Sequence, residues 1–183
     1  MSDKSNVQVF YIALSDENDR IKFMDSWIGC VDGKRIDGVK ISEYPAQYER
    51  KKRIGMFGYD LSIQEIGCFL AHRNAWELCV EKNVPILVLE SDMQPVRSEV
   101  MKSLLDEIGD YIDRFDLLRL HGLFINNIKF SREIAALNDG FKIVQGMGDP
   151  MGAGGYMLKP QAARRLLTVS SSFWLPVDVF LGA

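Results

Sequence analysis

The chain has 183 residues, of which 47% are hydrophobic and 26% are charged, and its formal net charge is −3. This length allows one domain with a proper core, and this composition excludes a largely disordered chain. The charge excludes a broad basic surface for a nucleic-acid backbone. We therefore expect a single domain over residues 1–183 and no nucleic-acid partner.

The sequence has no long apolar segment of the kind found in secretion signals or membrane spans. Its three cysteines, Cys30, Cys68 and Cys79, are widely spaced and form no C-x-x-C pair. Such spacing is typical of reduced thiols in a cytosolic protein. We therefore expect a cytoplasmic protein, an expectation that is compatible with a peripheral contact with the inner membrane.

The N-terminal third alternates between strand and helix patterns. Residues 7–14 form a short apolar, β-branched and aromatic run, which predicts a buried first strand. Residues 17–27 predict a helix with acids in its first turn, and Ser15 offers an N-cap. Residues 27–31 predict a second short strand. Residues 34–59 are rich in charge and glycine, so we expect an irregular connection there, such as a substrate-side loop.

A helix with clear signals at both ends follows. Ser62 and Glu65 have the spacing of a capping box, and Asn83 can close the helix in the left-handed conformation. Apolar residues recur between them at helical spacing, and Trp76 is expected in the core. Residues 85–92 then form a run that is apolar on both strand faces, which indicates a central strand of a mostly parallel sheet.

The alternation continues to the C-terminus. A helix is expected to begin near Pro95, and strands are expected at residues 115–122 and 141–146. A glycine-rich loop runs into a further short strand within residues 147–158, and Pro160 suits the first position of a helix. This order of elements predicts an α/β sandwich with helices on both faces of one sheet.

Glu90 and Asp92 stand where the predicted central strand ends. Ligands of α/β sheets bind beyond the carboxyl ends of the strands. Carboxylates at such an end suit Mg²⁺ or Mn²⁺, and a nucleotide-sugar transferase uses such an ion to neutralise its leaving diphosphate. Acidic strand ends also occur in phosphatases, kinases and helix caps, so these two residues alone leave the reaction open.

The helix and the strand together resemble a paired signature of glycosyltransferase family 25, the bacterial lipopolysaccharide and lipooligosaccharide sugar transferases. In that family L-[ST]-x-x-E-[IV]-[GA]-C-x-x-S-H-x-x-x-W precedes an apolar strand that ends L-E-D-D. The residues that match the helical part are Leu61, Ser62, Glu65, Ile66, Gly67, Cys68, His72 and Trp76. Weaker matches at Asp19-Arg20, at residues 154–167 and at residues 176–178 extend the resemblance over nearly the whole chain.

The resemblance implies a GT-A-like (Rossmann-like) nucleotide-sugar-binding domain with a mostly parallel central sheet. It also implies a reaction, in which a hexose, most often galactose from UDP-galactose, is transferred with inversion to a saccharide of lipooligosaccharide or lipopolysaccharide. The expected cofactor is Mn²⁺ or Mg²⁺. The expected partners are therefore the UDP-sugar donor and the saccharide acceptor.

The resemblance further implies roles for individual residues. Asp92 would hold the metal, and Glu90 and Asp178 would be catalytic, with Asp178 as a candidate base for the acceptor hydroxyl. Arg20 could pair with the diphosphate through its planar fork. The residues expected to bind the donor are Asp19, Arg20, Glu65, His72, Ser91, Gly154 and Gly155.

The residues themselves leave plainer interpretations open. Glu65 would complete the capping box, His72 lies near the edge of the apolar helix face, and Asp178 could simply begin a short helix. Ser91 stands where the family has an aspartate, and the chain stops at Ala183, soon after the last matching motif. A C-terminally truncated domain is therefore expected as one possibility, and the alternative function is a catalytically impaired or non-catalytic relative that binds nucleotide or assists another transferase.

Overall fold

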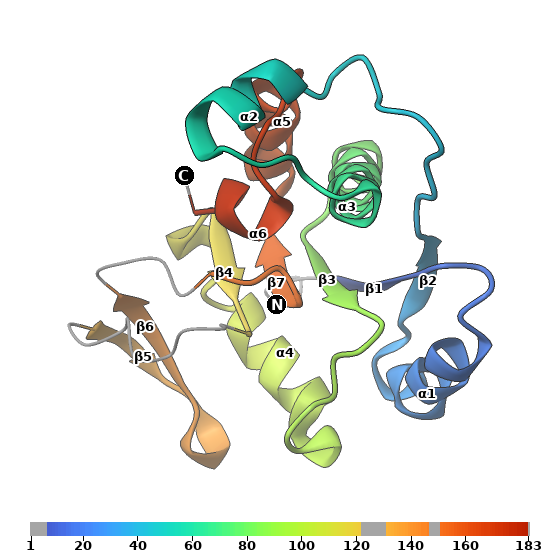
Figure 1. Ribbon diagram of the computed structural model, residues 1–183. Helices are drawn as coiled ribbons and strands as arrows, with labels where there is room; N and C mark the ends of the chain where they lie inside the picture. The colour runs from blue at the N-terminus through green and yellow to red at the C-terminus, as the bar shows by residue number, and fades with distance from the viewer. Residues whose placement is uncertain (1–6, 122–130, 147–150, 183) are drawn as a thin grey trace.

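The computed structural model describes residues 7–121, 131–146 and 151–182, and a five-stranded sheet forms its centre (Figure 1). The strands stand in the order β2 (Lys34–Asp37), β1 (Gln8–Ala13), β3 (Ile86–Glu90), β7 (Gly155–Leu158) and β4 (Leu117–Arg119). β1 pairs in parallel with β2 and β3, whereas β7 is antiparallel to both β3 and β4. The sheet is therefore mixed, and the expectation of a mostly parallel sheet is not confirmed, because β7 enters between β3 and β4 in the opposite direction.

Helices cover both faces of this sheet, as expected (Figure 1). They are α1 (Asn18–Ile28), α2 (Arg50–Phe57), α3 (Ile63–Lys82), α4 (Met101–Gly109), α5 (Pro160–Val169) and α6 (Val177–Phe180). Among the described residues, no helix has the length and apolar character needed to cross a membrane.

β3 is buried on both faces, which confirms the prediction of a central strand. Ile86 and Val88 belong to the core that the sheet forms with α3 and α5. Leu87 and Leu89 belong to the core on the opposite face, formed with α1 and α4. Glu90, the last residue of the strand, is only partly buried and is the first side chain to leave these cores.

α3 begins and ends as its sequence predicts. The Ser62 hydroxyl accepts a hydrogen bond from the Glu65 backbone N–H at 3.1 Å, and the Ser62 backbone N–H donates to the Glu65 carboxylate at 2.7 Å. Asn83 ends the helix with a φ of 51°, in the left-handed region. Local contacts cap both ends of the helix, so its first and last residues are fixed. The positions of the side chains that face the clefts follow from these fixed ends.

The segment between α1 and α3 differs from the sequence-based expectation. α1 continues to Ile28 and passes into a 3-10 helix over Gly29–Val31, so the strand predicted at residues 27–31 is wrong, and the N-cap of α1 is Glu17 instead of Ser15. The connection expected to be irregular contains β2 and α2. β2 carries polar residues because it is an edge strand with one neighbour, so it lacks the apolar pattern by which strands are recognised.

A two-stranded antiparallel sheet of β5 (Ser131–Ala136) and β6 (Lys142–Gly146) lies apart from the main sheet. The sequence predicted β6 but not β5. Of the predicted strand at residues 115–122, the structure forms β4 alone, and residue 122 lies outside the described residues. Of the glycine-rich loop, residues 147–150 also lie outside them.

Candidate functional site

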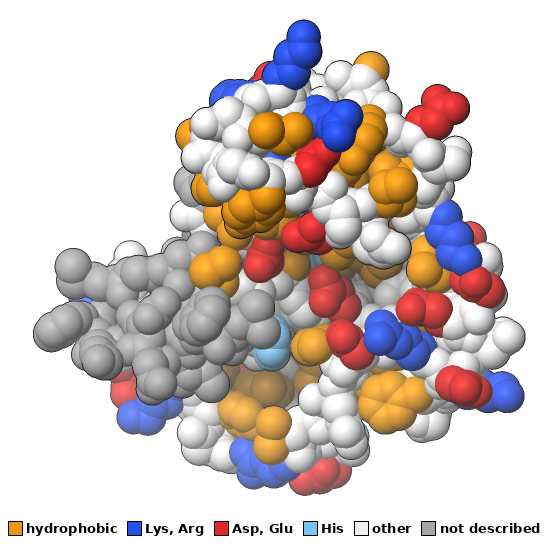
Figure 2. All heavy atoms as spheres, in the orientation of Figure 1, with side chains coloured by type: hydrophobic (Ala, Val, Ile, Leu, Met, Phe, Trp, Pro, Cys, Tyr) orange, Lys and Arg blue, Asp and Glu red, His pale blue; other side chains and the backbone are white. Residues whose placement is uncertain are grey.

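Two clefts meet where β3 ends. The first has a volume of about 560 Å³ and lies between the ends of β1 and β3 and the first turns of α3, with Arg20 and Lys40 in its lining. The second has a volume of about 360 Å³ and is lined in part by Glu65, His121 and Asp178. The residues common to both linings are Cys68, Glu90 and Asp92. Figure 2 shows acidic side chains gathered around the hollowed centre of this face.

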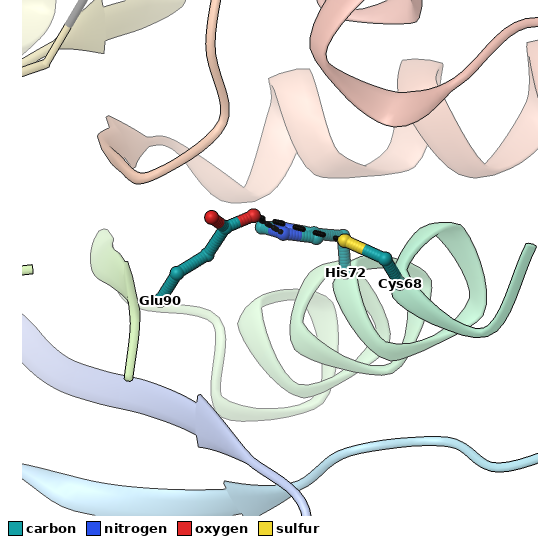
Figure 3. Close-up of side chains that lie close together, drawn as sticks. All are labelled: Cys68, His72 and Glu90. Atoms are coloured by element: carbon teal, nitrogen blue, oxygen red, sulfur yellow. Dashed lines mark hydrogen bonds and ion pairs between the residues drawn. The ribbon is translucent and has the colours of Figure 1, made fainter. Parts of the chain in front are cut away.

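Glu90 receives two hydrogen bonds from α3. His72 Nε2 lies 3.2 Å from Glu90 Oε1, and the Cys68 thiol donates to the same oxygen at 3.7 Å. Cys68 and His72 are four residues apart, so both project from one face of the helix toward the strand end (Figure 3). The other oxygen of Glu90 is turned away from both donors, and it has no hydrogen bond among the described residues (Figure 3).

A buried chain of hydrogen bonds fixes which nitrogen of His72 carries its proton. Trp76 Nε1–H donates to the Tyr156 hydroxyl at 2.8 Å, and that hydroxyl lies 2.8 Å from His72 Nδ1. The indole nitrogen can only donate, so the Tyr156 oxygen accepts from Trp76. The Glu90 carboxylate can only accept, so it takes its hydrogen bond from a proton on Nε2, and Nδ1 of a neutral imidazole then accepts from the Tyr156 hydroxyl. A neutral His72 then carries its proton on Nε2 and donates it to Glu90.

This chain of hydrogen bonds keeps Glu90 charged although the side chain is partly buried. Burial alone would raise the pKa of the Glu90 carboxyl. The hydrogen bonds from His72 and Cys68 favour the carboxylate, and they hold the pKa of Glu90 below its usual value. Glu90 is therefore a fixed anion at the junction of the two clefts.

The same three side chains lie close enough together to be compared with the ligand sets of metal ions. The ligand atoms of Cys68, His72 and Glu90 all lie within 4.8 Å of one another. A sulfur, nitrogen and oxygen set is typical of zinc and unsuited to Mg²⁺ or Mn²⁺, which prefer oxygen. Cys68 and His72 instead both hydrogen-bond the same oxygen of Glu90, so we interpret these side chains as a hydrogen-bonding support for Glu90. Oxygen ligands suited to Mg²⁺ or Mn²⁺ remain at Asp92 and at the second oxygen of Glu90.

The second cleft is strongly acidic. Its lining includes the carboxylates of Glu65, Glu90, Asp92 and Asp178. Burial raises the pKa of the Cys68 thiol to about 12, and the charges of Glu90, Asp178 and Asp92 contribute to that rise. Three carboxylates therefore act on one point between the clefts, and an anionic ligand such as a diphosphate would be repelled there unless a cation accompanied it.

The remaining predicted residues lie at different depths. Arg20 lines the first cleft and pairs with Glu17 at 3.6 Å, and Ser91 is buried in the wall of the same cleft. Asp19 is exposed on α1 and is not part of either lining. Asp178 lies in the first turn of α6, where the sequence placed it, and also lines the second cleft.

The two predicted glycines serve close packing. Gly154 lines the second cleft, and its backbone carbonyl accepts a hydrogen bond from the Glu90 N–H at 2.9 Å. A side chain at Gly154 would meet Met93 Sδ at 2.6 Å and His121 Nδ1 at 3.0 Å. Gly155 lies outside both linings and begins β7, with Leu89 beside it.

Some residues of the site have roles that were not predicted from the sequence. The hydrogen bond from the Cys68 thiol to Glu90 could have been predicted, because Cys68 lies four residues before His72 on the same helix face. Tyr156 gave no such signal, because it lies far from Trp76 in the sequence and meets it only through the pairing of β7 with β3. Lys40 follows β2, a strand that the sequence did not predict.

A protein-family model matches residues 6–181, a range that includes the residues of both clefts. The matching model is described as glycosyltransferase family 25 (LPS biosynthesis protein). In a search among curated proteins, no sequence matches the chain.

Proposed function

The chain belongs to glycosyltransferase family 25 and is a glycosyltransferase of LPS biosynthesis, and we propose that it transfers galactose from UDP-galactose to a saccharide of lipooligosaccharide. The observation that carries the proposal is the meeting of two clefts at the shared acids Glu90 and Asp92. Sugar transfer needs a donor and an acceptor on opposite sides of one reacting carbon, and two clefts with a common floor supply that arrangement.

The first cleft is proposed to hold the donor. Arg20 and Lys40 lie in its lining and would face the diphosphate, while Ser91 and His72 form part of its wall. The guanidinium of Arg20 could turn from Glu17 to the diphosphate, since it is more than half exposed. Mg²⁺ or Mn²⁺, held by Asp92 with Glu90 in support, would neutralise charge on the leaving diphosphate.

The second cleft is proposed to hold the acceptor. Asp178 is a partly buried carboxylate in its lining. There it would contact the hydroxyl of a bound acceptor sugar and accept its proton. As the hydroxyl oxygen bonds to the anomeric carbon, its proton passes to Asp178, and the bond from that carbon to the diphosphate oxygen breaks. Attack from the side opposite the leaving diphosphate inverts the anomeric centre.

Glu65 is placed for both a structural and a functional role. It closes the capping box of α3 and also lines the second cleft. We propose that it assists binding of the sugar from the start of the helix. Because the acceptor is part of a lipid-linked saccharide, we also propose that the protein works in the cytoplasm, at the inner face of the membrane.

The test is transfer from UDP-galactose to a lipooligosaccharide saccharide, with Mn²⁺ and after its removal by a chelator. Wild type should form a β-linked product when Mn²⁺ is present and none after the chelator has removed it. Asp92→Asn should lower the rate by about a hundredfold or more, since a metal ion contributes several kcal/mol to stabilising the leaving group.

The control is Asp106→Asn, which removes the same charge from an exposed position on α4. It should keep the wild-type rate. If wild type gave no turnover and no Mn²⁺-dependent binding of UDP, the proposal would fail in favour of a non-catalytic relative. If wild type were inactive and Ser91→Asp were active, the site would have lost its activity through the replacement of the family's aspartate by Ser91.

A further inference from the structure

Large apolar side chains are exposed in unusual number around α2. Six of the eleven exposed large hydrophobic residues of the described chain fall between residues 44 and 63. These residues, named here the α2 surface, are Tyr44, Ile54, Met56, Phe57, Tyr59 and Ile63. Met56 and Tyr59 are the most exposed of them, at 62% and 61%. Figure 2 shows hydrophobic side chains beside basic ones over this upper part of the molecule, where Figure 1 places α2.

Basic residues are set among these apolar side chains. α2 begins with four of them, Arg50 to Arg53. Arg50 pairs with Asp60 at 2.5 Å, and Lys52 pairs with Glu49 at 3.2 Å. Lys51 and Arg53 have no acidic partner among the described residues, so the surface retains positive charge although the whole chain is negative.

Arg53 is the least expected residue of the group. The residue is only 3% exposed, and its Nε has no hydrogen-bond partner among the described residues. The guanidinium lies 4.2 Å from the centre of the Phe57 ring and 4.5 Å from that of Tyr59. Among the described residues this buried cation has no acidic partner, so the faces of the two rings stabilise it and its charge lies beneath the α2 surface.

The α2 surface is held firmly against the rest of the fold. Tyr48 and Phe173 are both buried and form an isolated bridge, with hydrogen bonds from the Glu49 N–H to the Phe173 carbonyl and from the Phe173 N–H to the Gln47 carbonyl. The Tyr48 hydroxyl donates to Asp60 at 2.5 Å. The exposed apolar side chains are therefore displayed by an ordered segment with few degrees of freedom to lose on binding.

We propose that the α2 surface docks on an anionic lipid bilayer. Apolar and aromatic side chains would enter the region between headgroups and acyl chains, and the exposed Lys51 would meet the lipid phosphates. Ile63 belongs to this surface and also lines the first cleft, so docking brings the bilayer to the rim of the site. The reason for binding a membrane rests on the proposed function, in which the acceptor is lipid-linked. Binding itself depends only on the residues of the α2 surface and does not require turnover.

The test is sedimentation with vesicles of phosphatidylglycerol and phosphatidylcholine, or of phosphatidylcholine alone, in the absence of any substrate. Wild type should bind the anionic vesicles, and raised salt should weaken the binding. The double variant Lys51→Glu/Met56→Asp should bind them about tenfold more weakly or worse, because it loses a cation and an apolar contact. Both positions are exposed, so the fold should persist.

The matched control is Lys102→Glu/Val96→Asp, which makes the same change of charge at exposed positions outside the α2 surface. It should bind like wild type, and both double variants should transfer sugar to a soluble acceptor at the wild-type rate. The proposal is overturned if wild type ignores anionic vesicles, or if the two double variants bind equally. Either result would leave the proposed transfer reaction untouched, since that is measured with the soluble acceptor.

Discussion

At Glu90, two side chains of α3 donate to the same carboxylate oxygen, and this leaves the other oxygen for a ligand. Nε2 of His72 donates to the Glu90 carboxylate, which can only accept, and Nδ1 accepts from the Tyr156 hydroxyl, whose oxygen accepts from Trp76. None of these three aromatic groups needs to touch a substrate. They act through Glu90 and are best described as positioning residues.

Tyr156→Phe tests this chain of hydrogen bonds. The substitution removes one oxygen and strands Trp76 Nε1 and His72 Nδ1 in a buried setting. Each stranded group should cost about 1–3 kcal/mol in the free energy of unfolding, measured by urea denaturation. With the proton of His72 no longer fixed, kcat should fall about tenfold or more while KM for the donor changes little.

Two further variants separate positioning from general damage. Tyr111→Phe removes a hydroxyl for which the described residues show no hydrogen bond, and it should match wild type in both measurements. His72→Gln keeps a donor near the position of Nε2 and should retain more activity than His72→Leu. The interpretation is refuted if Tyr156→Phe loses stability but keeps the wild-type kcat.

At the scale of elements, α3 carries most of the site, and its start serves two purposes. Ser62 and Glu65 exchange hydrogen bonds that close the helix, and Glu65 also faces the second cleft. Ser62→Ala should lower the free energy of unfolding by about 1 kcal/mol and leave KM for the acceptor unchanged. Glu65→Gln keeps a capping side chain and should preserve stability, but it should raise KM for the acceptor. Equal effects of both variants on KM would assign Glu65 to the cap alone.

The sequence predicted α3 and β3 well because their signals are local. A capping box, a left-handed Asn83 and a run of apolar residues lie within the elements that they define. β2 and α2 were missed for the opposite reason. β2 is an edge strand with polar side chains, and α2 is held by contacts with residues 172–173, more than a hundred positions away. Only tertiary structure brings such partners together.

At the scale of the whole molecule, the fold brings into one cleft acidic residues that the sequence analysis identified separately. The pattern of residues 85–92 predicted that Glu90 and Asp92 stand at a strand end. It could not predict that Asp178, from the C-terminal α6, lines the same cleft, or that Asp19 lies outside it. The position of Asp178 depends on how α6 packs against α3, which no local pattern records.

The donor is assigned to the first cleft and the acceptor to the second, and the affinity for UDP tests this assignment most directly. Calorimetric titration with Mn²⁺ present should show that Asp92→Asn binds UDP about tenfold more weakly or worse than wild type. Asp178→Asn should bind UDP within about twofold of wild type while losing sugar transfer, because its carboxylate serves the acceptor. Equal loss of UDP binding in both variants would contradict the assignment of donor and acceptor to separate clefts.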